Sequence, residues 1–157
     1  MAFFVSATTA PSPKTTNSKT IAIAYAALLT TFAVTQLFWF ENLPTLFESF
    51  GFEPVLAVLS AALIVSLEVL AIPFLLRMRL SPAFRYLSMA CGWLVAIFWI
   101  SVSLYVMISG AHVSTIGFLG SEIPITPGWW AVFMSFALLV MATWASWGLW
   151  PGKARVK

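Results

Sequence analysis

The sequence has little charge and a single cysteine. Charged residues make up 8% of the 157 residues, whereas a soluble domain usually carries about 25%. This scarcity excludes an ordinary soluble globular protein. The lone cysteine, Cys91, excludes an intramolecular disulfide and any Cys-x-x-Cys redox pair within the chain. Lysine and arginine outnumber the acidic residues, eight to five, but they lie at the ends of apolar runs, so they indicate membrane topology and not nucleic-acid binding.

Long apolar runs dominate the rest of the chain, which is 61% hydrophobic. A helix needs about 20 apolar residues to cross the roughly 30 Å hydrocarbon core of a bilayer. Four stretches meet this requirement: 20–40, 54–76, 86–109 and 129–150. Their short connections predict an all-α fold, an integral membrane four-helix up-down bundle over residues 20–150. We expect a disordered cytoplasmic tail over 1–19 and a basic cytoplasmic tail over 151–157.

The charges predict how the bundle is oriented. All the basic residues fall on one side of the predicted membrane: Lys14, Lys19, Arg77, Arg79, Arg85, Lys153, Arg155 and Lys157. Four of the five acidic residues fall on the other side. Because basic residues concentrate in cytoplasmic connections, both chain termini are predicted to be cytoplasmic. Three tryptophans, Trp93, Trp99 and Trp144, lie within spans, where we expect them to be packing residues.

The first outer connection, between the first two spans, predicts a short helix at the membrane interface. Apolar residues recur there at helical spacing, namely Leu43, Leu46, Phe47 and Phe50. Asn42 is a suitable N-cap, Gly51 a suitable C-terminal stop, and Pro54 a suitable first residue for the next helix. This short helix is either a simple amphipathic connector or a surface for a partner.

The second outer connection, over residues 110–128, is rich in glycine and proline, which predicts an ordered, turn-rich excursion without long regular structure. Its titratable residues are His112 and Glu122. Structural zinc sites require four ligands, so two such residues favour a hydrogen-bonded loop over a metal site. No metal is expected.

One acidic residue, Glu68, lies inside the second apolar span. An ionised carboxylate at mid-helix costs about 2.5–3.5 kcal/mol on insertion scales, so such residues usually face the bundle interior or a water-filled cavity. Burial favours the neutral form, which donates a hydrogen bond. Small and apolar residues share the face of Glu68: Ala57, Ser60, Ala61, Ile64 and Val65. That face is therefore predicted to be a helix contact.

Equal depth in the membrane predicts the partners of Glu68. Counting along the helices from the inner boundary reaches Thr30, Thr31 and Thr143, which we expect to form a buried polar site with Glu68. Pro73 lacks a backbone donor and favours a kink, so it is predicted to be a hinge. Glu68 is either a structural clamp between helices or a functional acid that is proton-linked or faces a quinone. Glu68→Gln should preserve the fold in both cases and impair function only if a change of protonation matters.

Two stretches resemble the DoxX/MauE-like family of bacterial inner-membrane four-helix proteins. The run "QLFWFENLPTLFESFGFEPVLAVLSAALIVSLEVL" is similar to the family's first half, with a Phe-rich outer segment and a glutamate, Glu68, in the second helix. The stretch "IGFLGSEIPITPGWW" lies where MauE-like members carry a Gly-Cys-Phe-Gly element, with Gly117, Phe118, Leu119 and Gly120 in the corresponding places. The resemblance covers roughly residues 20–150.

The resemblance implies thiol- or quinone-linked redox work and help in the maturation of partner redox proteins. Phe118 stands where those members have a thiol, so direct disulfide exchange on the outer face is not expected. We therefore expect a DoxX-like accessory protein that binds a membrane or periplasmic redox partner, or a lipophilic molecule such as a quinone, and is not an enzyme on its own. The alternatives are a proton-linked transporter or channel component, which predicts a homo-oligomer, and a structural subunit of a membrane complex.

Overall fold

The computed structural model describes residues 7–109, 115–120 and 127–150, and within them the regular structure is helical. The helices are α1 (Thr16–Phe38), α2 (Leu43–Ser49), α3 (Pro54–Leu75), α4 (Pro82–Ser109) and α5 (Trp129–Gly148). The predicted all-α fold is confirmed, including the short helix between the first two spans. His112, Glu122 and the tail over 151–157 lie outside the described residues.

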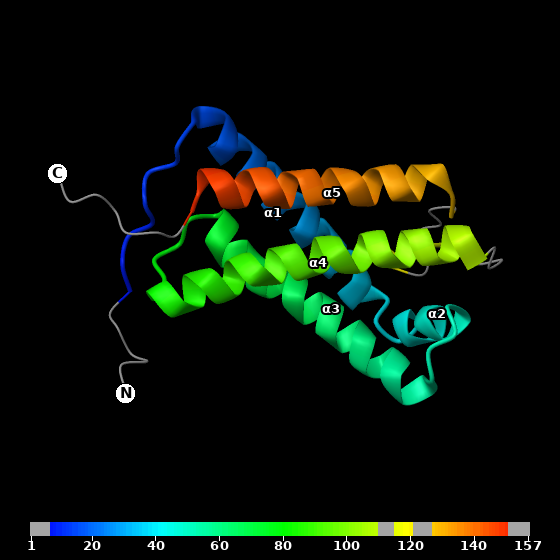
Figure 1. Cartoon of the computed structure of the whole chain (residues 1–157). Coiled ribbons are helices and arrows are strands. Elements are labelled where there is room, and N and C mark those ends of the chain that lie inside the picture. Colours follow the sequence, from blue (N-terminus) through cyan, green and yellow to red (C-terminus); the bar gives the residue numbers. More distant parts are fainter. Residues whose placement is uncertain (1–6, 110–114, 121–126, 151–157) are drawn as a thin grey trace.

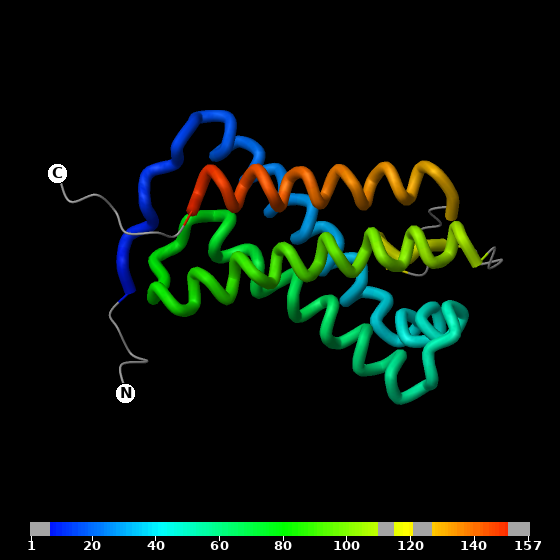
Figure 2. The backbone as a smooth tube through the Cα atoms, in the orientation of Figure 1, coloured from blue at the N-terminus to red at the C-terminus, as the bar shows by residue number. Residues whose placement is uncertain are grey.

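The four long helices are each long and apolar enough to cross a membrane, so the chain is a multi-pass membrane protein. They run up and down in chain order, as Figure 1 shows. α1 packs against α3 and α5, and α4 packs against the same two helices, which closes a ring of four neighbours. In the backbone trace α4 and α5 run nearly side by side, while α1 and α3 are inclined to them (Figure 2).

Residues 7–15 run along one end of the bundle before α1, within the stretch 1–19 for which a disordered tail was expected, and residues 1–6 lie outside the described residues. α1 begins at Thr16 because Thr15 and Ser18 form a capping box, in which each side chain accepts a hydrogen bond from the other's backbone N–H. Upstream, the Thr8 N–H donates to the Leu80 carbonyl at 3.1 Å, and the Lys14 N–H donates to the Gly148 carbonyl at 3.0 Å. Residues 7–15 thus connect α1, the α3–α4 connection and the end of α5.

The short helix α2 turns its apolar side toward the protein. Leu43, Leu46 and Phe47 are buried, and the Phe47 ring lies 5.8 Å from the Phe98 ring of α4 between centroids. The predicted boundaries hold: α2 follows Asn42, Gly51 has a left-handed φ of +93° after it, and Pro54 begins α3. α2 therefore caps the end of the bundle predicted to face outward.

Candidate functional site

Glu68 is fully buried inside the bundle, on the α3 face that also buries Ala57, Ala61 and Ile64. Its carboxyl oxygen Oε1 accepts a hydrogen bond from Trp99 Nε1 at 3.1 Å. The same oxygen accepts a second one from Gln36 Nε2 at 3.3 Å. Because Gln36 lies on α1 and Trp99 on α4, this one oxygen connects three of the four long helices.

The second outer connection also reaches this carboxyl group, through Gln36. Gln36 Nε2 donates its other hydrogen bond to the backbone carbonyl of Phe118 at 3.1 Å. The Phe118 side chain is buried, and its ring lies 4.8 Å from the Trp99 ring and 5.7 Å from the Phe32 ring between centroids. We call Gln36, Glu68, Trp99 and the Phe118 carbonyl the Glu68 cluster. Residues 115–120 close the cluster from the predicted outer side.

Two glycines allow residues 115–120 to approach α1 and α2 closely. Gly117 has φ +93°, and a Cβ there would overlap the Leu46 side chain and lie 3.7 Å from the Trp99 ring. Gly120 has φ +81°, and a Cβ there would lie 3.2 Å from the Thr35 carbonyl oxygen. Side chains disfavour this left-handed backbone region, which glycine adopts readily. These glycines belong to the motif that suggested a family resemblance, and in this chain they fit the loop onto α1 and α2.

In the Glu68 cluster the N–H donors are paired and two oxygen atoms are open. Both hydrogens of the Gln36 amide are engaged, whereas Gln36 Oε1 and Glu68 Oε2 are buried without a hydrogen-bond partner among the described residues. Among these same residues no lysine or arginine forms an ion pair with Glu68. Chemically, the cluster can hold helices together through N–H donors, and its open oxygens can form further hydrogen bonds.

The three threonines predicted to accompany Glu68 lie elsewhere. Thr30, Thr31 and Thr143 are exposed on the surface of the bundle. Their hydroxyl groups donate to carbonyls one turn back in their own helices, at 2.7, 2.9 and 2.8 Å respectively. The prediction of a Glu68–threonine site is therefore wrong, and Gln36 and Trp99 take the place of the threonines. The count along the helices gave depth but not the face of the helix on which each threonine lies, and all three lie on exposed faces.

The predicted hinge, Pro73, lies in a part of α3 that α4 supports. Helix α3 continues past Pro73 to Leu75. The Ser88 hydroxyl group of α4 accepts a hydrogen bond from the Phe74 N–H at 3.0 Å and donates one to the Leu70 carbonyl at 2.6 Å. Leu70 and Phe74 are an i, i+4 pair, so the hydroxyl group bridges the helical ladder next to the proline. This contact fixes the α3 backbone to α4 one turn beyond Glu68.

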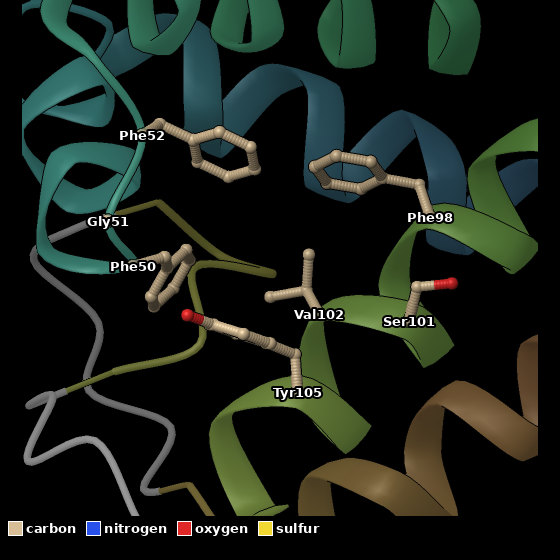
Figure 3. Close-up of a pocket in the computed structure, with 7 residues that line it drawn as sticks. All are labelled: Phe50, Gly51, Phe52, Phe98, Ser101, Val102 and Tyr105. Carbon is tan, nitrogen blue, oxygen red and sulfur yellow. The ribbon is translucent and has the colours of Figure 1, made fainter. Parts of the chain in front are cut away.

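An aromatic pocket of about 420 Å³ lies beside the cluster, between α4 and the connection from α2 to α3. Figure 3 shows the rings of Phe50, Phe52, Phe98 and Tyr105 around a common space. Gly51, Ser101 and Val102 complete the lining. The Phe98 ring is 5.3 Å from the Trp99 ring, edge to face. The Phe98 ring thus lies between the pocket and Trp99, which belongs to the Glu68 cluster.

Sequence reasoning placed Glu68 in the bundle but missed Gln36, the hydrogen bond of Trp99 and the aromatic pocket. Gln36 carried a signal of its own, because an amide within an apolar span requires partners in the bundle. Trp99 was expected to be a packing residue, and its fully buried ring does pack, but its N–H also binds Glu68. The aromatic pocket could not be predicted from the sequence, because only the fold brings the connection from α2 to α3 together with the second half of α4.

Together, the fold and the site define a multi-pass membrane bundle that encloses a carboxyl, amide and indole cluster beside an aromatic pocket. No family model matches the chain, and neither the curated proteins nor the solved structures contain a match.

Proposed function

We propose that this protein is a DoxX/MauE-like accessory protein of the bacterial inner membrane that binds a lipophilic molecule with a flat polar ring, such as a quinone. The aromatic pocket is the observation that carries this proposal. Its volume of about 420 Å³ lies within the range of roughly 300–1,000 Å³ that is usual for small-molecule sites. Its lining is mostly apolar, with the hydroxyl group of Tyr105 as a polar group, as such sites generally are.

The aromatic side chains suit a flat ring. Phenylalanine and tyrosine rings favour offset-stacked or edge-to-face neighbours, and the rings of Phe50, Phe52, Phe98 and Tyr105 surround the pocket (Figure 3). Tyr105 is 55% exposed on α4, so its hydroxyl group can reach a ligand that enters from the membrane. A quinone carbonyl would accept a hydrogen bond from this group, and its isoprenoid tail would remain among the lipid chains.

In this proposal Glu68 is a structural clamp. It is fully buried and lies behind the Phe98–Trp99 ring pair, so it does not line the pocket. Its two hydrogen bonds hold Trp99 and Gln36, and Gln36 in turn holds the loop at Phe118. The clamp keeps the wall behind Phe98 rigid, and a rigid wall lowers the entropic cost of binding.

The bound molecule would be presented to a redox partner protein on the predicted outer side, the role that the resemblance to DoxX/MauE-like proteins implies. The alternative of a proton-linked transporter has less support. The hydroxyl groups of Thr30, Thr31 and Thr143, which a transporter would need beside Glu68 to form a polar path, bind their own helices on the bundle surface.

Titration of the purified protein in detergent with decylubiquinone, followed by quenching of tryptophan fluorescence, tests the proposal. We expect saturable binding that Tyr105→Leu weakens by roughly 5- to 30-fold, because the variant loses about 1–2 kcal/mol of ring contact and hydrogen bonding. The matched control is Tyr86→Leu, which removes the other exposed tyrosine of α4, outside the pocket. Equal binding by the wild type and Tyr105→Leu would refute the assignment of this pocket.

A further inference from the structure

A second pocket, of about 470 Å³, lies at the opposite end of the bundle, where the described chain begins. It is formed by residues 9–10, the first turns of α1, the end of α3 and the connection that follows α3. Three cationic side chains line it, namely Lys19, Arg77 and Arg79. We call it the basic pocket. We propose that the basic pocket binds the phosphate head group of an anionic phospholipid.

Charge is the first argument. The described acidic residues outside the bundle interior, Glu41, Glu48 and Glu53, are in the connection between α1 and α3, at the other end of the molecule. Within the described part of the chain, Lys19, Arg77 and Arg79 form no ion pair. Three cations without an anionic partner repel one another, so a phosphate group would stabilise them. Basic pockets between membrane helices are a known way of binding lipid head groups.

Arg77 supplies an independent argument, because it occupies a backbone position that favours glycine. It follows the last turn of α3 with φ +57°, a left-handed conformation in which glycine is the usual residue after a helix. The Nη2 group of Arg77 donates to the Pro11 carbonyl at 3.1 Å, while its Nε atom is buried without a partner among the described residues. The chain therefore keeps a guanidinium group here at a conformational cost.

The apolar side of the pocket distinguishes a lipid from free phosphate. Ile23 is 47% exposed and Leu76 is 50% exposed, and both line the pocket together with buried Leu75. Ile23 lies one helical turn further into the bundle than Lys19, so the apolar surface continues from the cations toward the membrane interior. A phosphodiester with acyl chains matches both parts, whereas inorganic phosphate matches the cations alone. The basic pocket lies at the opposite end of the bundle from the aromatic pocket. Because a quinone also carries no charge, the lipid proposal does not depend on the quinone proposal.

Native mass spectrometry of the delipidated protein with equal amounts of phosphatidylglycerol and phosphatidylcholine tests the inference. We expect phosphatidylglycerol to bind at least five-fold better in the wild type. The double variant Lys19→Gln/Arg79→Gln should lose roughly 25-fold in affinity for phosphatidylglycerol, about five-fold per charge removed. Both side chains are exposed, so the variant should fold. The matched control is Lys14→Gln: Lys14 lies at the same end, outside the pocket and 4.7 Å from the Trp147 ring centroid, and its removal should leave binding unchanged.

Three results would overturn the inference. The two lipids could bind equally well, which would remove the role of the head-group charge. The double variant could bind phosphatidylglycerol as the wild type does, which would place the lipid elsewhere. Alternatively, 10 mM inorganic phosphate could displace the lipid at constant ionic strength, which would make this a site for free phosphate. Far-ultraviolet circular dichroism of each variant confirms that helix content is retained, and none of these readouts depends on quinone binding.

Discussion

At the scale of single residues, the clamp depends on one oxygen atom. Glu68 Oε1 accepts both hydrogen bonds, from Trp99 at 3.1 Å and from Gln36 at 3.3 Å. Glutamine at position 68 would keep a carbonyl oxygen that can occupy this place. Leucine, which is similar in size, would leave the indole and amide N–H groups without this acceptor in a buried environment.

We therefore expect Glu68→Gln to lower the free energy of unfolding by clearly less than Glu68→Leu does, because the Trp99 and Gln36 donors keep an acceptor and the cost is confined to the new amide N–H groups. Glu68→Leu should lower it by roughly 2–6 kcal/mol, because each of the two buried donors left unpaired costs about 1–3 kcal/mol. Unfolding by dodecyl sulfate in mixed micelles, followed by circular dichroism, measures the difference. Thr143→Val is the control, since it removes an exposed hydroxyl group that binds only its own helix.

A Glu68→Leu variant as stable as the wild type would contradict the clamp. Decylubiquinone binding to Glu68→Gln separates structure from protonation: a clamp predicts retained binding. A folded Glu68→Gln protein that no longer binds the quinone would instead show that the carboxyl group must change its protonation state.

Residue-level reasoning on the sequence located Glu68 because a carboxyl group in an apolar run has few stable environments, and the bundle interior is one of them. It failed for the partners because the count along the helices gave depth but not the helix face, and the three threonines lie on exposed faces. The long side chains of Gln36 and Trp99 also extend well beyond their own turns, so the depth of a Cα atom is a poor guide to the position of its polar group.

At the scale of whole elements, hydropathy predicted the four spans because a helix in lipid must be apolar over its full crossing length. Helix ends were less predictable. α1 starts at Thr16 and α4 at Pro82, each four residues before the apolar stretch predicted from hydropathy, because capping and turn residues decide where a helix begins. The inward course of residues 115–120 was not predictable, since it depends on contacts with Leu46, Trp99 and Thr35 that are remote in sequence.

Substitution of Gly117 tests how closely residues 115–120 pack against α2. Gly117→Ala should lower the free energy of unfolding by more than about 2 kcal/mol. It combines the roughly 1–2 kcal/mol cost of a left-handed side chain with displacement of Leu46. Gly51→Ala is a matched control with the same φ of +93°, but its Cβ would meet only the Tyr105 hydroxyl group, at 3.9 Å. Gly51→Ala should therefore show the conformational cost alone. Equal destabilisation by the two substitutions would mean that the loop does not pack against α2.

At the scale of the whole molecule, the two proposed sites lie at opposite ends of the bundle. The aromatic pocket adjoins the end that carries Glu41, Glu48 and Glu53, and the basic pocket lies at the end with Lys19, Arg77 and Arg79. This separation would allow an anionic lipid to anchor one end while the other end receives a lipophilic ligand. Membrane orientation is a condition for the proposed redox role, because a partner on the outer side can reach the aromatic pocket only if the basic end is cytoplasmic, as the positive-inside rule predicts.

Labelling of single cysteines in intact bacterial spheroplasts measures that orientation. Cys91 is buried, and Cys91→Ser gives a background without reactive thiols. In this background we would place a cysteine at Thr45, exposed on α2, or at Asn17, exposed in the first turn of α1. A membrane-impermeant maleimide should label Thr45→Cys in intact spheroplasts, and Asn17→Cys only after lysis, because the basic residues flanking the spans hold the Asn17 end inside. The reverse pattern would turn the basic pocket outward and the aromatic pocket toward the cytoplasm. In that case a redox partner on the outer side could not reach the proposed quinone site.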